Sequence, residues 1–195
     1  MRLRAIALAT IAAAAAAAAC GGPHRASRIP EGSGPLVATY RAELVREGEP
    51  ARRAKLLVWA QAPDRLHAEL LPPVGGSPVT LDAGGGRAVL VDVEAGAAYV
   101  GDAGPEALAP LTGVSIGVAD AVAALLNGTA PEGARVDREG EAPGVLPLRF
   151  ALTLGGSRIG LTRLRWERTT RDPSTLGTGE PPAGLTVRPL AEWER

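Results

Sequence analysis

One catalytic motif in the sequence surrounds Ser115, in the pentapeptide Gly113-Val114-Ser115-Ile116-Gly117. The pattern G-x-S-x-G is typical of a nucleophile elbow, where the serine of a hydrolase stands on a turn between a strand and a helix. Such a serine needs a histidine later in the chain. Both histidines, His24 and His67, precede Ser115. We therefore expect no catalytic residue and no enzymatic activity, and we expect Ser115 to cap the helix that follows it.

Metal and cofactor chemistry also lacks candidate residues. His67 lies in a stretch where apolar and polar residues alternate, without a second histidine or a cysteine to share a metal ion. We expect its side chain to be solvated or hydrogen-bonded on the polar face of a strand. The glycines at 84–86 lie between two expected strands, whereas a phosphate-binding loop leads from a strand into a helix. We therefore expect no metal site and no cofactor.

The N-terminal residues predict export. Met1–Arg4 is short and positively charged, and Ala5–Ala19 is an apolar run. As a helix this run would be about 22 Å long, which is short of the roughly 30 Å hydrocarbon core of a membrane. Residues 1–19 are therefore predicted to form a signal peptide that is removed after export. Residues 20–35 are rich in Gly, Pro, Ser and Arg, and we expect them to form a flexible tether.

Cys20, the only cysteine, directly follows the apolar run in Ala17-Ala18-Ala19-Cys20-Gly21. This stretch resembles the bacterial lipobox, although leucine is usual where Ala17 stands. The resemblance implies cleavage before Cys20, diacylation of its thiol, acylation of the new amine with a fatty acid such as palmitate, and a membrane anchor. The alternative is cleavage at the Ala17-x-Ala19 pattern, which would release a soluble exported protein. Lipidation is favoured because a single cysteine has no disulfide partner within the chain, and two or more acyl chains anchor stably.

Localisation and partners follow from the residues around the anchor and from the charge balance. No aspartate follows Cys20; by resemblance to sorted lipoproteins, this implies the periplasmic face of the outer membrane. The chain has 21 basic and 21 acidic residues, and it lacks the basic excess of a nucleic-acid binder. We expect a monomer that does not bind nucleic acid.

Residues 36–195 are expected to form one domain of mainly β structure. The stretch Ala51–Leu81 predicts two strands joined by a Pro-Asp turn, then a proline-glycine loop and a third strand. Apolar and polar residues alternate in the first two of these strands and again through Leu146–Leu154, as in strands with one buried face. The period becomes helical over Pro105–Leu111 and Val118–Asn127. Roughly nine strands with a helical pair inserted midway predict a single curved antiparallel sheet with a helical lid.

Several short motifs lie along the expected domain. They are a tryptophan in the second strand, a Pro-Asp turn, a Pro-x-Gly loop, a helix that opens with Gly-Val and ends with Leu-Leu-Asn-Gly, and a C-terminal tryptophan. Their residues are Trp59, Pro63-Asp64, Pro73-Val74-Gly75, Gly117-Val118, Leu125-Leu126-Asn127-Gly128 and Trp193. With these motifs the chain resembles, over roughly Leu36 to Trp193, the LolB family of outer-membrane lipoprotein receptors, and more distantly the LolA carriers. The resemblance implies that the sheet is an unclosed β-barrel under the helical lid.

The resemblance implies an apolar cavity that holds acyl chains of lipoproteins or lipids, a chaperone-like transport role, and a periplasmic LolA-like carrier as partner. It also implies a projecting apolar loop, where Val74 stands in place of the leucine of LolB. We expect the ligand cavity to be lined by Tyr40, Leu44, Leu57, Trp59, Leu66, Leu70, Val118, Val122, Leu125, Phe150 and Leu152. An apolar face that its own chain does not fill makes a concave site for an apolar ligand.

Three alternatives remain at this stage. The first is a binding or sensing module of the same fold that passes no cargo on. The second is a structural envelope lipoprotein whose interior is fully packed. The third is an esterase that uses Ser115.

Overall fold

The computed structural model describes residues 36–71, 78–140, 146–168 and 180–193. The signal peptide, Cys20 and the tether are expected in the first 35 residues and lie outside this described part. Val74, in the expected projecting loop, also lies outside it.

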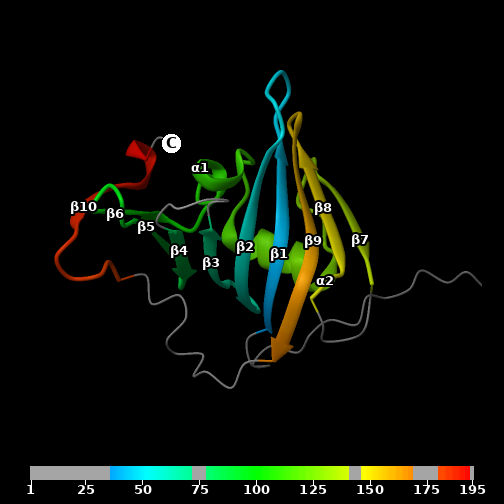
Figure 1. Ribbon diagram of the computed structural model, residues 1–195, viewed down its shortest axis with the longest axis horizontal. Coiled ribbons are helices and arrows are strands. Elements are labelled where there is room, and N and C mark those ends of the chain that lie inside the picture. Colours follow the sequence, from blue (N-terminus) through cyan, green and yellow to red (C-terminus); the bar gives the residue numbers. More distant parts are fainter. Residues whose placement is uncertain (1–35, 72–77, 141–145, 169–179, 194–195) are drawn as a thin grey trace, which may run out of the picture.

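The described residues form a mainly β protein with one sheet of ten strands that does not close into a barrel. The sheet is curved, and the helices lie on one side of it (Figure 1). The expected fold class is therefore confirmed. Across the sheet the order is β10-β6-β5-β4-β3-β2-β1-β9-β8-β7. The strands are β1 (Leu36–Val45), β2 (Arg52–Gln61), β3 (Arg65–Leu71), β4 (Val79–Gly84), β5 (Arg87–Asp92), β6 (Ala97–Asp102), β7 (Arg135–Glu139), β8 (Arg149–Leu154), β9 (Ser157–Arg168) and β10 (Thr186–Pro189).

The two edge strands differ from the sequence-based expectation. All neighbouring strands pair antiparallel except β10, which runs parallel to β6 with Thr186 opposite Ala97. The expectation of a purely antiparallel sheet is wrong at this edge. Parallel pairing needs a long connection, and the long stretch of chain between β6 and β10 allows one. At the other edge, β7 was not expected. Its outward residues Arg135, Asp137 and Glu139 are all exposed, so the stretch lacks the apolar alternation that identifies a buried strand.

Two α-helices and one 3-10 helix complete the fold. They are α1 (Ala109–Thr112), α2 (Val118–Asn127) and η2 (Leu190–Glu192). Helix α2 has the expected bounds and lies behind β2, β1 and β9 in Figure 1. It ends at Gly128, whose left-handed backbone lets its N–H reach the carbonyls of Ala123 and Ala124. Helix α1 is shorter than the expected helix over Pro105–Leu111.

Ser115 does not cap α2, so that expectation is wrong. Gly117 occupies the N-cap position and makes no side-chain hydrogen bond. The Ser115 hydroxyl instead contacts the carbonyl of Pro105, at 3.3 Å, and the carboxylate of Glu106. It lies two residues before the cap and therefore closes the loop between α1 and α2 onto the segment that precedes α1.

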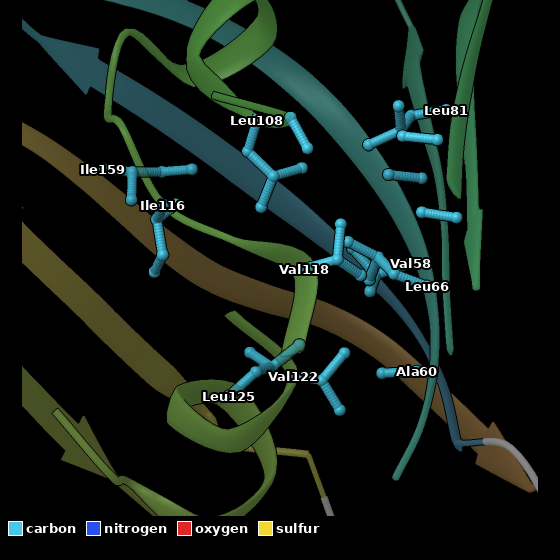
Figure 2. Packing of buried hydrophobic residues seen from close by; sticks show 14 of the residues in the cluster. Val58, Ala60, Leu66, Leu81, Leu108, Ile116, Val118, Val122, Leu125 and Ile159 are labelled. Atoms are coloured by element: carbon cyan, nitrogen blue, oxygen red, sulfur yellow. The ribbon is translucent and has the colours of Figure 1, made fainter. Parts of the chain in front are cut away.

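The core lies between the sheet and α2. Val118, Val122 and Leu125 face the strands, where Val58, Ala60 and Leu66 point toward them (Figure 2). Tyr40 on β1 is fully buried in the same cluster, and its hydroxyl donates a hydrogen bond of 3.2 Å to the Pro147 carbonyl. Burial raises the pKa of the Tyr40 hydroxyl far above its ordinary value, despite the opposing charges of Arg163 and Arg138. Tyr40 thus remains neutral and ties the segment before β8 to β1.

Replacing Tyr40 by Phe tests this tie. The substitution leaves the buried Pro147 carbonyl without that donor, so we expect a loss of about 1–3 kcal/mol in the free energy of unfolding. Urea denaturation of the purified protein measures the change. Tyr99 is the matched control because it is also buried in the core, and among the described residues its hydroxyl has no hydrogen bond. Tyr99→Phe should change stability by less than about 0.5 kcal/mol. Equal losses in both variants would contradict a specific role for the Tyr40 hydroxyl.

Candidate functional site

An apolar hollow of about 100 Å³ lies between the inner face of the sheet and the two α-helices. None of the described residues that line it is charged, and only Thr112 is polar. The Thr112 hydroxyl donates a hydrogen bond of 2.7 Å to the Leu108 carbonyl, so its polarity is satisfied by the chain itself. The lining is Ala42, Leu44, Leu56, Val58, Leu66, Ala68, Leu70, Leu108, Leu111, Thr112, Ile116, Ala121, Leu125, Phe150, Leu152, Ile159 and Leu161.

The hollow results from the period of two in five strands. Side chains at alternate positions of β1, β2, β3, β8 and β9 point to the same face of the sheet. On that face the strands carry leucine, isoleucine, valine and phenylalanine next to small residues such as Ala42 and Ala68. The covering side comes from Leu108, from Leu111 and Thr112 of α1, from Ile116 in the loop, and from α2. Short helices cover this face without filling every space that the small residues leave.

Six of the eleven residues expected in the cavity line this hollow: Leu44, Leu66, Leu70, Leu125, Phe150 and Leu152. Three more expected residues, Tyr40, Val118 and Val122, are buried in the same apolar cluster, but they do not line the open space. The structure therefore brings nine of the expected residues together on the inner side of the sheet.

Leu57 and Trp59 were expected in the cavity, and this prediction is wrong. Both lie on the outer face, where Trp59 packs against Val37 in a separate small cluster. The inner positions of β2 are Leu56 and Val58 instead. The sequence does contain a signal for this choice, because Arg53, Lys55 and Gln61 share the face of Leu57 and Trp59. A strand face with three polar side chains is expected to face water, even when it also carries one aromatic residue.

Sequence reasoning also missed Ile159, Leu161 and Ile116. Ile159 and Leu161 alternate with Arg158, Gly160 and Thr162. In a strand that starts at Ser157, this alternation places both apolar side chains on the inward face. The sequence reading placed a loop there and began the strand near Leu164. Ile116 lies between two helices, where no periodic pattern indicates a direction.

A second hollow, the mouth hollow, adjoins the first and has a volume of about 240 Å³. It shares the side chains of Ala42, Leu44, Leu70 and Leu111 with the apolar hollow, and its remaining lining is Arg46, Glu49, Pro50, Arg52, Arg53, Ala54, Pro110 and Trp193. The inner wall is thus apolar and the rim is charged. The Arg46 side chain reaches from the end of β1 to Gly113 after α1, where an added Cβ would stand 2.0 Å from the Arg46 Nε.

A third hollow, of about 950 Å³, has a different character. Eight of the fourteen described residues that line it are charged, and they lie on β1, β2, β7, β8 and β9. Ion pairs of 2.8 Å between Arg53 and Glu43 and 3.2 Å between Arg149 and Glu139 cross its margins. Transferring an acyl chain into such a polar and open surface removes little apolar area from water, so this hollow is unsuited to an apolar ligand.

His67 is hydrogen-bonded on the outer face, as expected from its position in the alternating pattern. Its Nδ1 lies 2.7 Å from Asp82 Oδ1 on β4, and its Nε2 lies 3.1 Å from Glu69 Oε1. The ring also stands edge-on to Trp59, with centroids 4.6 Å apart. Among the described residues, no group of three or more His, Cys, Asp or Glu side chains is arranged to hold a metal ion.

Comparison of the sequence with protein-family models and with curated proteins gives no match. Within the described part of the chain, no helix is long and apolar enough to cross a membrane. The site is therefore interpreted from its own geometry.

The environment of His67 predicts a pH-dependent stability. Burial by itself lowers the pKa of the imidazole, but the hydrogen bonds and charges of Asp82 and Glu69 outweigh it and raise the pKa above 6.5. The charged imidazole therefore stabilises the fold fully below pH 6.5, and this stabilisation is lost as the pH rises through the raised folded-state pKa. Thermal unfolding from pH 6 to pH 9 should show the decline, and His67→Gln should remove it. Parallel pH profiles for the wild type and the variant would contradict the assignment.

Proposed function

We propose that this protein binds acyl chains of lipoproteins or lipids in the apolar hollow and helps to localise them to the outer membrane. The observation that carries the proposal is the hollow itself. Among the described residues that line it, none is charged, and the one polar side chain is already hydrogen-bonded. Ligand sites are concave and mostly apolar, with few polar groups. The resemblance of residues 36–193 to the LolB family supports the same function, and it suggests a LolA-like carrier as the donor of cargo.

No chemical step is needed for this function. Each methylene group removed from water contributes about 0.8 kcal/mol, so a bound acyl chain is held by the burial of its own apolar surface. The same chain gains at least as much in a lipid bilayer. Transfer therefore follows from the difference in affinity between donor, protein and membrane, and the protein only has to shield the chain from water in between.

The volumes indicate how an acyl chain is accommodated. Pockets that enclose a drug-sized ligand have about 300–1,000 Å³, whereas the apolar hollow has about 100 Å³ and the mouth hollow about 240 Å³. The apolar hollow thus takes the end of the chain, and the mouth hollow takes the part nearer the head. Ala42, Leu44, Leu70 and Leu111 line both spaces, and the three leucines are half-buried. We expect rotamer changes of these leucines to join the two spaces.

The second candidate function is a non-transporting envelope lipoprotein of the same fold, which acts as a binding, sensing or structural module. The small volume of the apolar hollow favours this reading, because a carrier has to hide a whole chain. The two functions differ in the fate of the ligand. A carrier releases its acyl chain to acceptor vesicles, a sensor retains it, and a structural module binds none.

Filling the hollow tests the proposed site. Ala121 on α2 lines it, and Ala121→Leu places additional carbon atoms in the space that the chain end would occupy. Displacing about two methylene groups from the hollow costs about 1.6 kcal/mol, so we expect binding to weaken about tenfold or more. Displacement of a fluorescently labelled acyl chain measures the affinity.

Ala119→Leu is the matched control, because Ala119 is exposed on the same helix. It should leave the affinity unchanged. Both variants should remain folded, since filling an empty apolar space is tolerated or stabilising. Equal affinity in the wild type and Ala121→Leu would show that acyl chains do not enter this hollow.

We also propose that the thiol of Cys20 is diacylated and that the mature protein is held at the periplasmic face of the outer membrane. The support is the sequence context of this single cysteine. The intact mass of the protein, purified from the membrane fraction of a bacterial host, should contain the added acyl groups. Cys20→Ser should release the protein from the membrane fraction. A mass that corresponds to cleavage after Ala19 without acylation would contradict the anchor.

A further inference from the structure

The mouth hollow changes its chemistry from one end to the other. Its inner wall is made of Leu44, Leu70 and Leu111, which also border the apolar hollow. Its rim carries the guanidinium groups of Arg46 and Arg52 at the end of β1 and the start of β2. A molecule that extends from the apolar hollow through the mouth thus passes from apolar side chains to cations. This order of apolar and charged surroundings is complementary to a single-chain amphiphile with a charged head.

The rim has an excess of positive charge. Arg53 is already paired, because its Nη2 lies 2.8 Å from Glu43 Oε1 on the outer face. Arg46 and Arg52 instead share one carboxylate, that of Glu49, at distances of 3.8 Å and 3.3 Å. Glu49 is the only acidic residue among the described residues that line the mouth hollow. Two guanidinium groups that share one carboxylate leave an excess of one positive charge among the described residues of the rim.

The pairs at the rim are easily exchanged. The side chains of Arg46, Arg52 and Glu49 are 38%, 64% and 40% exposed. Ion pairs at such exposure contribute only about 0–1 kcal/mol, because water competes for both partners. An incoming anion therefore loses little by replacing Glu49 as the partner of either arginine. The planar guanidinium also offers parallel donors that match a carboxylate or a phosphate.

We infer that the ligand whose acyl chain occupies the apolar hollow has an anionic head, a carboxylate or a phosphate, which binds Arg46 and Arg52 at the mouth. This inference rests on the proposed function, and it adds the chemical class of the ligand. A neutral lipid with the same chain gains only the apolar contacts. An anionic lipid gains charge-assisted hydrogen bonds at the rim as well.

The experiment compares three ligands with the same acyl chain: a fatty alcohol, a fatty acid and a monoalkyl phosphate. Each competes with a neutral, fluorescently labelled acyl probe for the full-length mature protein at pH 7.5. We expect the two anions to bind about fivefold more tightly than the alcohol, because each of the two exposed guanidinium groups adds a weak charge-assisted hydrogen bond. The preference should fall as salt is added, because the rim is exposed. Binding of only the fatty acid would assign the head as a carboxylate, and binding of only the phosphate would assign it as a phospholipid-type head.

Two variants are expected to change the preference for anions in opposite directions. Arg46→Gln/Arg52→Gln should abolish the preference for the anions over the alcohol, so that the three ligands bind with equal affinity. Glu49→Gln removes the competing carboxylate and should increase the preference for the anions over the alcohol about threefold or more. The control is Arg87→Gln/Arg188→Gln, which removes two exposed arginines on β5 and β10, outside the mouth lining. This control should behave as the wild type.

The outcomes separate this inference from the proposed function. Equal affinity of the wild type for the alcohol and both anions would overturn the inference, while the acyl site would stand. A preference for anions that is the same in all variants would also overturn it, because the head would then bind elsewhere. Failure of the wild type to bind the neutral probe at all would overturn the proposed function itself.

Discussion

The structure depends on one constraint, which is that the inner apolar face of a wide, curved sheet has to be buried by very little helix. Ten strands at about 4.8 Å spacing make a sheet about 45 Å wide, whereas the ten residues of α2 form a rod of only about 15 Å. Curvature brings β3, β2, β1, β9 and β8 around this helix, and their inward side chains bury Val118, Val122 and Leu125. The remaining space at the margin of the helix is the apolar hollow.

Hydrogen bonds between polar groups join distant segments of this arrangement. Tyr40 ties the segment before β8 to β1 through the Pro147 carbonyl. At the other side, the buried carboxylate of Asp92 accepts the N–H of Ala95 at 3.1 Å and the indole N–H of Trp193 at 3.4 Å. The second contact brings the C-terminal tryptophan onto the sheet, where it forms part of the wall of the mouth hollow. A residue near the end of the chain thereby shapes a space beside β1.

The two faces of the sheet carry different kinds of side chains. Charged residues on the outer face are paired across strands, as with Arg53 and Glu43, or gathered around an imidazole, as with Asp82 and Glu69 around His67. On the inner face, none of the described residues that line the apolar hollow is charged. The two chemistries meet at the turn between β1 and β2, where Leu44 points inward and Arg46 lies at the rim. A site that joins an apolar interior to exposed cations arises there because the strands leave the helical cover at that point.

Spacing in the sequence predicts local elements: most of the period-two strands, the bounds of α2 and the mainly β class. These depend on neighbours within a few residues, and so they can be read from spacing. Long-range packing sets the parallel direction of β10, the pairing of β7 at the sheet edge and the volume of the hollow, and local spacing does not predict them. Alternation defines two faces of β2, and its polar residues indicate which of them is exposed even though Leu57 and Trp59 share that face. The size of a hollow depends on how side chains from distant strands and helices pack, and the approach of Arg46 to Gly113 joins residues that no local pattern relates.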